Sequence, residues 1–430
     1  MTATRRNQAL SDVPIAVSAV TAEALQNSGA NDIRSLNQLA PSLLVSSTGT
    51  EANGSARIRG IGTVGDNPGL ESSVAVFIDG VYRSRTGAGL NELGEIERIE
   101  VLRGPQGTLF GRNASAGLIN IVSKRPSFEF GANAEAGYGN FNYYRLAGGV
   151  TGPVLGDKVA ARIDGVYVKR DGFYKDLVSG GRVNDRDRYF IRGQLLIKPT
   201  DDIDIRLIGD YTKRKEACCA ATYLPVTETV DPTANTTTPG FNTDGAYTAG
   251  PNRILDVLRS FGGIINDDTY SRKISVSPGR TFKGTTRDYG VSGELNWDLG
   301  GAKLTSITAY RDYKSGGGGD VDYNNVDILF RANDGNAYRQ FKTFSQELRL
   351  QGQLFDDHLD FLVGGYYSNE KLKVSDNLQF GSQYGEFAAC RLITLLSASP
   401  ALRNNTAPGC QCRPPGPRHW PGHSAAPRRS

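Results

Sequence analysis

The sequence is poor in the residues that usually carry metal sites and acid–base catalysis. Its 430 residues include one methionine, five cysteines and three histidines, His358, His419 and His423. No Cys-x-x-Cys pair occurs, so a structural zinc site has little to build on. Only one histidine precedes position 400, which gives little support to general-base catalysis by imidazole. We therefore expect no enzyme, no metal and no cofactor.

Long apolar segments and a strong net charge are also absent. No run of about 18 apolar residues occurs, which excludes transmembrane helices. Met1–Arg6 has no apolar segment behind its charges, so any export signal is expected upstream of this sequence. The formal net charge of +4 is small for this length and gives no reason to expect nucleic acid as a partner.

Glycine and aromatic residues are plentiful, with 52 glycines, 19 tyrosines and 17 phenylalanines. This composition is typical of many short strands and turns. The first 126 residues read as a small α+β domain, because short helices mix with short strands there. Thr21 is placed to cap a first helix, and Asp79-Gly80 between apolar residues is a strong hairpin signal. We expect helices at 22–26 and about 33–40, and strands at about 12–20, 56–60, 74–78, 81–82, 96–102 and 118–123.

From about residue 128 the pattern changes to alternation of apolar and polar residues. In the clearest case, 289–299, Val291 and Leu295 alternate with polar neighbours. A period of two indicates strands with one apolar and one polar face. Lengths of about ten residues suit tilted strands that cross a bilayer. We expect nine strands, at about 131–138, 143–152, 158–170, 188–198, 203–214, 286–298, 302–314, 342–354 and 359–373.

The connections between these nine strands differ in length according to side. The turns at 153–157, 199–202, 299–301 and 355–358 are short and fall on one side. The loops at 171–187, 215–285 and 315–341 are long and fall on the other, where only 139–142 is short. Outer-membrane barrels have this arrangement. A soluble β-sandwich also alternates, but it would not predict the sided loop lengths.

Six segments follow one another through the first part of the chain: Asp12–Val17, Ile58–Gly60, Val76–Val81, Ile99–Gly107, Thr108–Gly117 and Ile119–Pro126. In this order they resemble the landmarks of the plug of TonB-dependent outer-membrane receptors. The resemblance implies an α+β plug domain over 1–126, followed over 127–389 by a partial antiparallel transmembrane β-barrel, truncated from one of 22 strands. Gly60–Gly65 also matches the dinucleotide fingerprint G-x-G-x-x-G. A loop follows it, Asp66–Gly69, instead of the helix that pyrophosphate binding requires.

The resemblance also implies a function. A receptor of this family takes up a scarce ligand, most often a ferric siderophore, across the outer membrane with energy supplied through the TonB complex. Its partners are that complex, outer-membrane lipid and the small-molecule ligand, and it works as a monomer. Nothing in the sequence selects among iron, cobalamin and sugars as cargo. By the same resemblance, we expect both the export signal and the segment that contacts TonB to be absent from this chain.

Four charged residues are candidates for holding a plug in a barrel. Arg59 and Arg103 resemble two plug arginines that, in the family, meet barrel glutamates. The candidate partners are Glu294 and Glu347, which lie on the polar sides of their predicted strands. Buried charges must be paired, and the guanidinium fork suits a carboxylate. The alternative is that all four are ordinary charges in a water-filled lumen.

Two further features do not follow the family pattern. Cys218 and Cys219 are adjacent in the long loop 215–285, where they either brace the loop or contribute to ligand capture; apolar residues at 254–265 suggest a short helix. Residues 390–430 hold seven of the 19 prolines, and we expect this stretch to be an aberrant, out-of-frame or disordered tail. The alternative function is therefore a non-functional remnant of a receptor. A passive porin is less suitable, since it needs no α+β domain.

Overall fold

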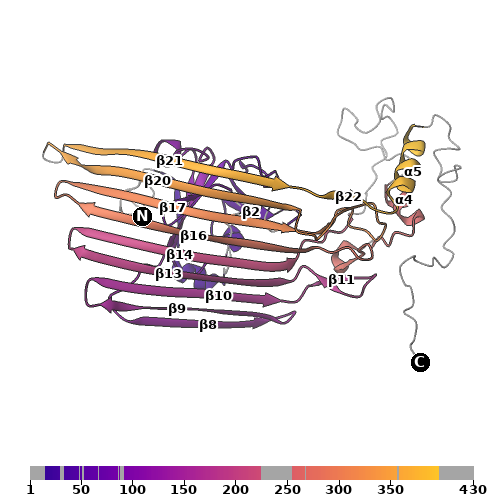
Figure 1. The fold of residues 1–430 in the computed structure, drawn as a ribbon, viewed down its shortest axis with the longest axis horizontal. Coiled ribbons are helices and arrows are strands. Elements are labelled where there is room, and N and C mark those ends of the chain that lie inside the picture. The colour runs from indigo at the N-terminus through magenta and orange to yellow at the C-terminus, as the bar shows by residue number, and fades with distance from the viewer. Residues whose placement is uncertain are drawn as a thin grey trace.

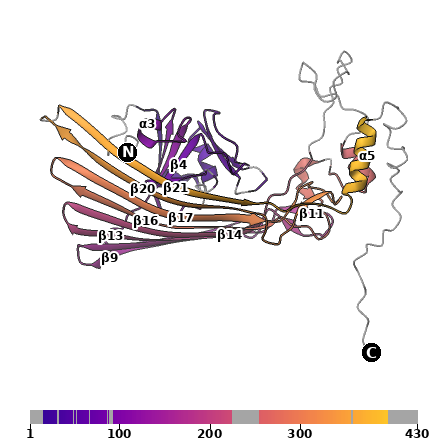
Figure 2. The same ribbon diagram turned by 45° about the horizontal axis from the view of Figure 1, so that its top comes forward.

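The computed structural model describes residues 15–29, 33–47, 49–50, 53–65, 67–85, 87, 92–223, 254–266, 268–355 and 358–396. Within these ranges the chain forms a small α+β domain and one large curved sheet, with the small domain on the concave side of the sheet (Figures 1 and 2). None of the helices in the described ranges is long and apolar enough to cross a membrane. Most of the predicted tail, residues 397–430, lies outside the described residues.

The small domain is built around a five-stranded sheet of order β1-β6-β7-β4-β5, beside a separate β2–β3 pair. Strands β4 and β7 are parallel, whereas β1–β6, β6–β7 and β4–β5 are antiparallel. Its elements are β1 (Val17–Thr21), α1 (Ala22–Ser28), η2 (Ile33–Gln38), β2 (Leu43–Ser47), β3 (Gly54–Ile58), β4 (Val74–Ile78), β5 (Val81–Arg83), β6 (Ile96–Arg103), α3 (Gly107–Phe110) and β7 (Gly117–Ser123).

Local sequence explains most of these elements. Thr21 caps α1 by accepting the backbone N–H of Ala24 at 3.2 Å. Asp79 and Gly80 both have positive φ, which the tight β4–β5 hairpin requires. Strands β4 and β7 are apolar on both faces, since η2 and β3 cover one side and α3 the other. The α+β fold of this domain is confirmed, although β2 and α3 were not predicted.

The large sheet contains all nine predicted strands, in the order β21-β20-β17-β16-β14-β13-β10-β9-β8. Each strand pairs antiparallel with its neighbours in sequence among these nine, which makes a meander. The bounds are β8 (Gly131–Gly139), β9 (Tyr143–Leu155), β10 (Val159–Arg170), β13 (Arg186–Thr200), β14 (Ile203–Ala217), β16 (Lys283–Asp298), β17 (Ala302–Gly317), β20 (Tyr338–Leu354) and β21 (Leu359–Ser375). We call this sheet the wall.

The two faces of the wall differ as the alternation predicts. Val291 and Ile163 point outward and are 62% and 55% exposed, although both are apolar. Residues one position away point to the concave face, where Arg162 and Ser345 are buried. The concave face is therefore polar and covered by the small domain, and the convex face is apolar and uncovered. Such a division fits a sheet whose outer side faces lipid.

The two ends of the wall also differ as predicted. Connections of two to four residues join the strands at one end, and at the other end the long loops carry small elements of their own (Figure 1). The helix expected within 254–265 is present as α4. The loop elements are β11 (Tyr174–Asp176), β12 (Arg182–Val183), α4 (Ile254–Ser260), η3 (Thr269–Ser271), β15 (Lys273–Ile274), β18 (Gly319–Asp320), β19 (Leu329–Arg331), β22 (Leu378–Phe380) and α5 (Tyr384–Leu396).

Three of these loops share a small apolar core. Helix α4 contributes Val257 and Leu258, α5 contributes Phe387 and Cys390, and the segment before β19 contributes Val326. All three segments are distant in sequence, yet they bury one another. We call this group of segments the outer cap.

Gly117, at the start of β7, is the position where a side chain should be least tolerated. Its φ is +141°, and a Cβ atom there would collide with the backbone carbonyl oxygen of Leu102 on β6. Gly117→Ala should therefore destabilise the chain by about 2–3 kcal/mol or more. Gly107→Ala is the matched control, because a Cβ at Gly107 would meet nothing within 4 Å. Thermal unfolding of both variants in detergent micelles tests this; equal midpoints would contradict the assignment.

Candidate functional site

A row of buried arginines from adjacent wall strands faces the small domain. Arg162 lies on β10, Arg188 and Arg192 on β13, and Arg206 on β14; Arg188 is 1% exposed and Arg206 is 3% exposed. Because side chains alternate along a strand, the even-numbered positions of β13 share the concave face. A guanidinium buried without partners would be costly, so each of these arginines must find acceptors. We call these four residues the arginine row.

Arg206 contacts the β4–β5 hairpin and the end of β7. It forms an ion pair with Asp79 at 3.3 Å and donates to the hydroxyl of Ser123 at 2.7 Å. Gln194 on β13 accepts from its Nε at 3.0 Å. Burial by itself would raise the pKa of Asp79, but Arg206 and Arg192 together hold that pKa below its ordinary value. The Asp79 carboxylate is therefore ionised where it meets the wall.

The other arginines contact the segment that leads into β6. Arg192 pairs with Asp164 on β10 at 2.9 Å and donates to the carbonyl oxygen of Glu95 at 2.8 Å. Asp164 in turn accepts the backbone N–H of Glu95 at 3.0 Å. Glu95 also forms an ion pair with Arg162. The segment around Glu95 is thus held to the wall by both its backbone and its side chain.

Arg188 completes the arginine row toward the loop end. It forms an ion pair with Glu92 of the small domain at 2.9 Å and another with Glu216 on β14. Both carboxylates are almost fully buried. Pairing on two sides compensates the desolvation of the guanidinium and fixes its orientation.

Contacts between the two parts continue along the rest of the wall. Val81 packs in an apolar cluster with Ile307 and Ala309 of β17. Arg85 forms an ion pair with Glu370 of β21 at 3.1 Å. Arg339 of β20 donates a hydrogen bond to the side-chain oxygen of Asn53 at 2.5 Å. At the opposite end Arg125 pairs with Asp204 at 2.5 Å. The small domain is therefore anchored across the whole width from β10 to β21.

The four residues proposed from sequence are distributed over both parts. Arg59 is exposed with φ +53°, and Arg103 is half-buried with its Nε 3.5 Å from the carbonyl oxygen of Ala16. Glu294 accepts from Asn296 at 2.7 Å, and Glu347 from Arg349 at 2.8 Å. Both carboxylates thus have partners on their own strands, and their pairing with Arg59 and Arg103 stays a prediction.

The arginine row was not recognised from the sequence. Its signal was present, because Arg162, Arg188, Arg192 and Arg206 all fall within predicted strands at concave-face positions. The carboxylates that accept from these arginines lie outside the predicted strands, so no alternation pattern marks them. Glu92 and Glu95 lie in a segment without regular structure, and the sequence around Asp79 indicates a turn but no ion pair.

A cavity of about 420 Å³ opens at the loop end, between the small domain and the ends of five wall strands. Loop residues Gly49, Asn53 and Pro68 of the small domain form its floor. The lining of this cavity carries both charged groups and aromatic rings, a mixture that suits a polar small molecule. These side chains are Arg214, Glu216, Phe282, Asp320, Tyr323, Arg331, Tyr338, Arg339 and Asp376. We call this space the loop-end cavity.

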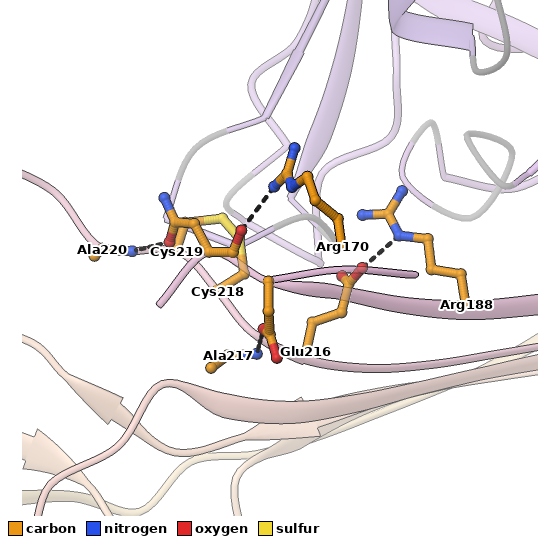
Figure 3. The surroundings of a disulfide bond; sticks show 9 residues. Arg170, Arg188, Glu216, Ala217, Cys218, Cys219 and Ala220 are labelled. Atoms are coloured by element: carbon orange, nitrogen blue, oxygen red, sulfur yellow. Dashed lines mark hydrogen bonds and ion pairs between the residues drawn. A yellow bond between two sulfur atoms is a disulfide. The ribbon is translucent and has the colours of Figure 1, made fainter. Parts of the chain in front are cut away.

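Figure 3 shows the disulfide that joins Cys218 and Cys219. Cys218 lines the cavity, and the backbone N–H of Cys219 donates to the carbonyl oxygen of Gly49 in the small domain at 3.2 Å. The flanking residues are held by the loop before β13, since Ala217 and Ala220 donate to side chains there at 2.5 and 2.8 Å. Backbone hydrogen bonds around the two cysteines therefore connect this wall loop to the loop before β13 and to the small domain.

A second cavity, of about 280 Å³, lies at the opposite end of the interface. Its lining includes Arg98, Arg125 and Arg206, together with Glu294 and Arg349. Among the described residues no group of three or more His, Cys, Asp or Glu side chains is arranged to hold a metal ion. The site is thus two polar cavities separated by a belt of ion pairs.

Residues 9–118 match the family model described as TonB-dependent Receptor Plug Domain. The pesticin receptor of Yersinia pestis is 31% identical over 137 residues, which cover 31% of this chain and 20% of that protein. The ferrioxamine B receptor of Salmonella typhimurium is 31% identical over 138 residues, covering 32% of this chain and 18% of that protein. The alignments therefore span about a fifth of the length of these curated relatives.

Solved structures extend the likeness to the wall. The ferric yersiniabactin uptake receptor FyuA from Yersinia pestis has a TM-score of 0.68 at 17% identity, covering 88% of this chain and 52% of that one. The ferripyoverdine receptor of Pseudomonas aeruginosa has a TM-score of 0.60 at 18% identity, covering 89% and 47%. At such identities the likeness establishes the fold. The chain spans about half of these structures.

The fold and the family match together define a plug domain with part of an antiparallel β-barrel. The small domain matches the plug domain of TonB-dependent receptors, and the nine-stranded wall has the fold of part of the barrel in the solved receptors.

Removing Arg206 should release the plug from the wall. Arg206→Met leaves the buried Asp79 carboxylate without its cation, which should destabilise the chain by about 3–5 kcal/mol. Adding Asp79→Asn removes the orphaned charge and should restore part of the loss. Thermal unfolding in detergent micelles measures both effects.

The matched control is Arg287→Met, because Arg287 is exposed on β16 and lies over the ring of Tyr289. We expect its free energy of unfolding to stay within about 0.5 kcal/mol of that of the parent. An Arg206→Met variant as stable as this control would mean that the ion pair does not anchor the plug.

Proposed function

We propose that this chain is the plug-bearing part of a receptor for energy-coupled uptake of a scarce small ligand, with a ferric siderophore as the first candidate. The loop-end cavity carries this proposal. It is the space that a ligand arriving from the loop side would enter, and its floor is the plug itself. Relatives named as ferrioxamine B and ferric-pyoverdine receptors support a siderophore as the ligand.

The lining of the cavity favours a ligand rich in oxygen donors. Arg214, Arg331 and Arg339 offer guanidinium groups, whose N–H forks suit carboxylate, hydroxamate or catecholate oxygens. Tyr323 and Tyr338 add flat aromatic surface. The relatives carry different siderophores in their names, so the particular cargo is left to experiment.

The belt of ion pairs supports an energy-coupled step. A ligand resting on Gly49 and Asn53 cannot pass while the plug is anchored at Asp79, Glu92 and Glu95. Moving the plug exchanges each buried ion pair for water, which costs less than exposing an apolar interface of the same size. A pulling force supplied through the TonB complex is the expected source of that work.

The remaining assignments are proposals of the same kind. We assign residues 1–126 to the plug and 127–389 to the barrel; the tail proposed over 390–430 would begin within α5, whose Cys390 packs in the outer cap. The outer membrane is the proposed location, and the receptor is proposed to act as a monomer. The rival proposal is a remnant that neither inserts nor transports. A passive porin has no use for an anchored plug.

Ligand binding by the chain in detergent micelles tests the proposal. The panel contains a ferric hydroxamate, a ferric catecholate and cyanocobalamin, and the readout is quenching of intrinsic fluorescence. We expect one ferric siderophore to bind, and Arg339→Ala to weaken it about tenfold or more, since a charge-assisted contact is worth about 1.5–3 kcal/mol. Arg287→Ala, on the outer face of β16, is the control.

Uptake in cells tests the energy coupling. Accumulation of the iron-55 complex should stop when a protonophore collapses the proton gradient. Binding of no member of the panel, or equal binding by both arginine variants, would reject the loop-end cavity as the ligand site. Binding without any uptake would favour the remnant.

The four sequence-derived charges have their own test. We propose that Arg59, Arg103, Glu294 and Glu347 contribute to plug retention. Arg103→Glu and Glu347→Arg should each loosen the plug, and the double exchange should restore its protection from added protease. A double variant no better than the single ones would show that the two residues do not pair.

A further inference from the structure

The loop after β17 carries an oxygen-rich sequence. Asp320, at the end of β18, is followed at alternate positions by Asp322 and Asn324, which precede β19 at the loop end of the wall. Alternate side-chain oxygens over a short loop are the arrangement used by calcium-binding loops. Asp320 also lines the loop-end cavity, so the loop is within reach of solutes there.

Asp320 is buried with one oxygen unused. The residue is 1% exposed. Its Oδ2 accepts the backbone N–H of Ser277 at 2.7 Å, and its Oδ1 is buried with only the carboxyl group of Asp322 in reach. Burying a carboxylate oxygen that accepts no hydrogen bond costs free energy, because the oxygen loses its hydrogen bonds to water and gains none in the protein. Two carboxyl groups so placed need a proton or a cation between them.

The carboxyl group of Asp322 is the neighbour of that of Asp320, within hydrogen-bonding reach. One oxygen of Asp322 accepts the backbone N–H groups of Ile328 and Leu329 at 3.0 and 2.8 Å. Two acceptors therefore face each other in a buried place. Burial, followed by the repulsion of Asp322, raises the pKa of Asp320 to about 8.

Basic side chains nearby are engaged elsewhere. Arg280 forms a two-bond contact with Asp327, at 2.9 and 3.0 Å. Arg331 forms another with Asp376, at 2.7 and 3.1 Å. Within the described part of the chain no Lys or Arg forms an ion pair with the Asp320–Asp322 pair. The pair therefore requires either a shared proton or a bound cation.

We propose that Asp320 and Asp322 bind a divalent cation of the calcium class, with backbone carbonyl and water oxygens completing its shell. Calcium accepts six to eight oxygen ligands in flexible geometry, whereas magnesium requires a near-ideal octahedron. Two carboxylates are few, so the dissociation constant should lie at about 10⁻⁴–10⁻³ M, as in extracellular calcium modules. The bound ion would fix the segment from Asp320 to Arg331, which forms one side of the loop-end cavity.

Terbium luminescence tests the site directly. Tyr323 follows Asp322, and the hydroxyl of Tyr223 donates to the carbonyl oxygen of Asp322 at 2.5 Å, so both can sensitise terbium. The whole chain in detergent micelles, treated first with EDTA, should give saturable emission that calcium displaces and magnesium does not. Asp320→Asn and Asp322→Asn should each lower the affinity about tenfold or more. Asp376→Asn, paired with Arg331 beside the same cavity, is the control.

Thermal unfolding separates the cation from the shared proton. Asp320 has a raised pKa in the folded chain, so without a cation stability should fall as the pH rises from about 4 to about 8. Saturating calcium should raise the unfolding midpoint near pH 8 and remove this fall. No terbium emission, or emission kept in both variants, would overturn the proposal. A pH-dependent midpoint that calcium leaves unchanged would assign the pair a proton instead.

Discussion

The arginine row is the constraint on which the rest of the structure depends. Arg162, Arg188, Arg192 and Arg206 are buried on the wall, and three of them find carboxylates that only the plug supplies. Neither part could bury its own charges alone at acceptable cost, because desolvation of a single ion exceeds what one surface hydrogen bond returns. The plug and the wall are therefore complementary in charge as well as in shape.

The arginine row also fixes the register of the wall. Each strand alternates between faces, so a slip of one residue would carry every arginine to the apolar outer side. Val291 and Ile163 would move inward by the same slip. The two requirements, charges toward the plug and apolar side chains outward, select the same pairing of strands. The short turns at the end of the wall away from the long loops are compatible with the same register.

The sequence allowed the nine wall strands and most of the plug to be predicted, because alternation, the Asp79-Gly80 turn and the Thr21 cap are local signals. The contacts between plug and wall were not predictable in this way. Arg206 and Asp79 are 127 positions apart, and no local pattern pairs them. Glu347 illustrates the difficulty, since Arg349 on its own strand is an equally charged partner. Strand β2 and helix α3 were missed because each is short and lacks a periodic pattern.

The outer cap has a consequence for kinetics. Val257, Val326 and Phe387 come from three connections far apart in sequence, yet they bury one another above the wall. Segments that share a core separate cooperatively, so they do not open one at a time. The movement of any solute past the outer cap would then depend on a single opening in which all three segments separate together. Its rate would depend on how tightly a few apolar side chains pack, and not on the length of the individual loops.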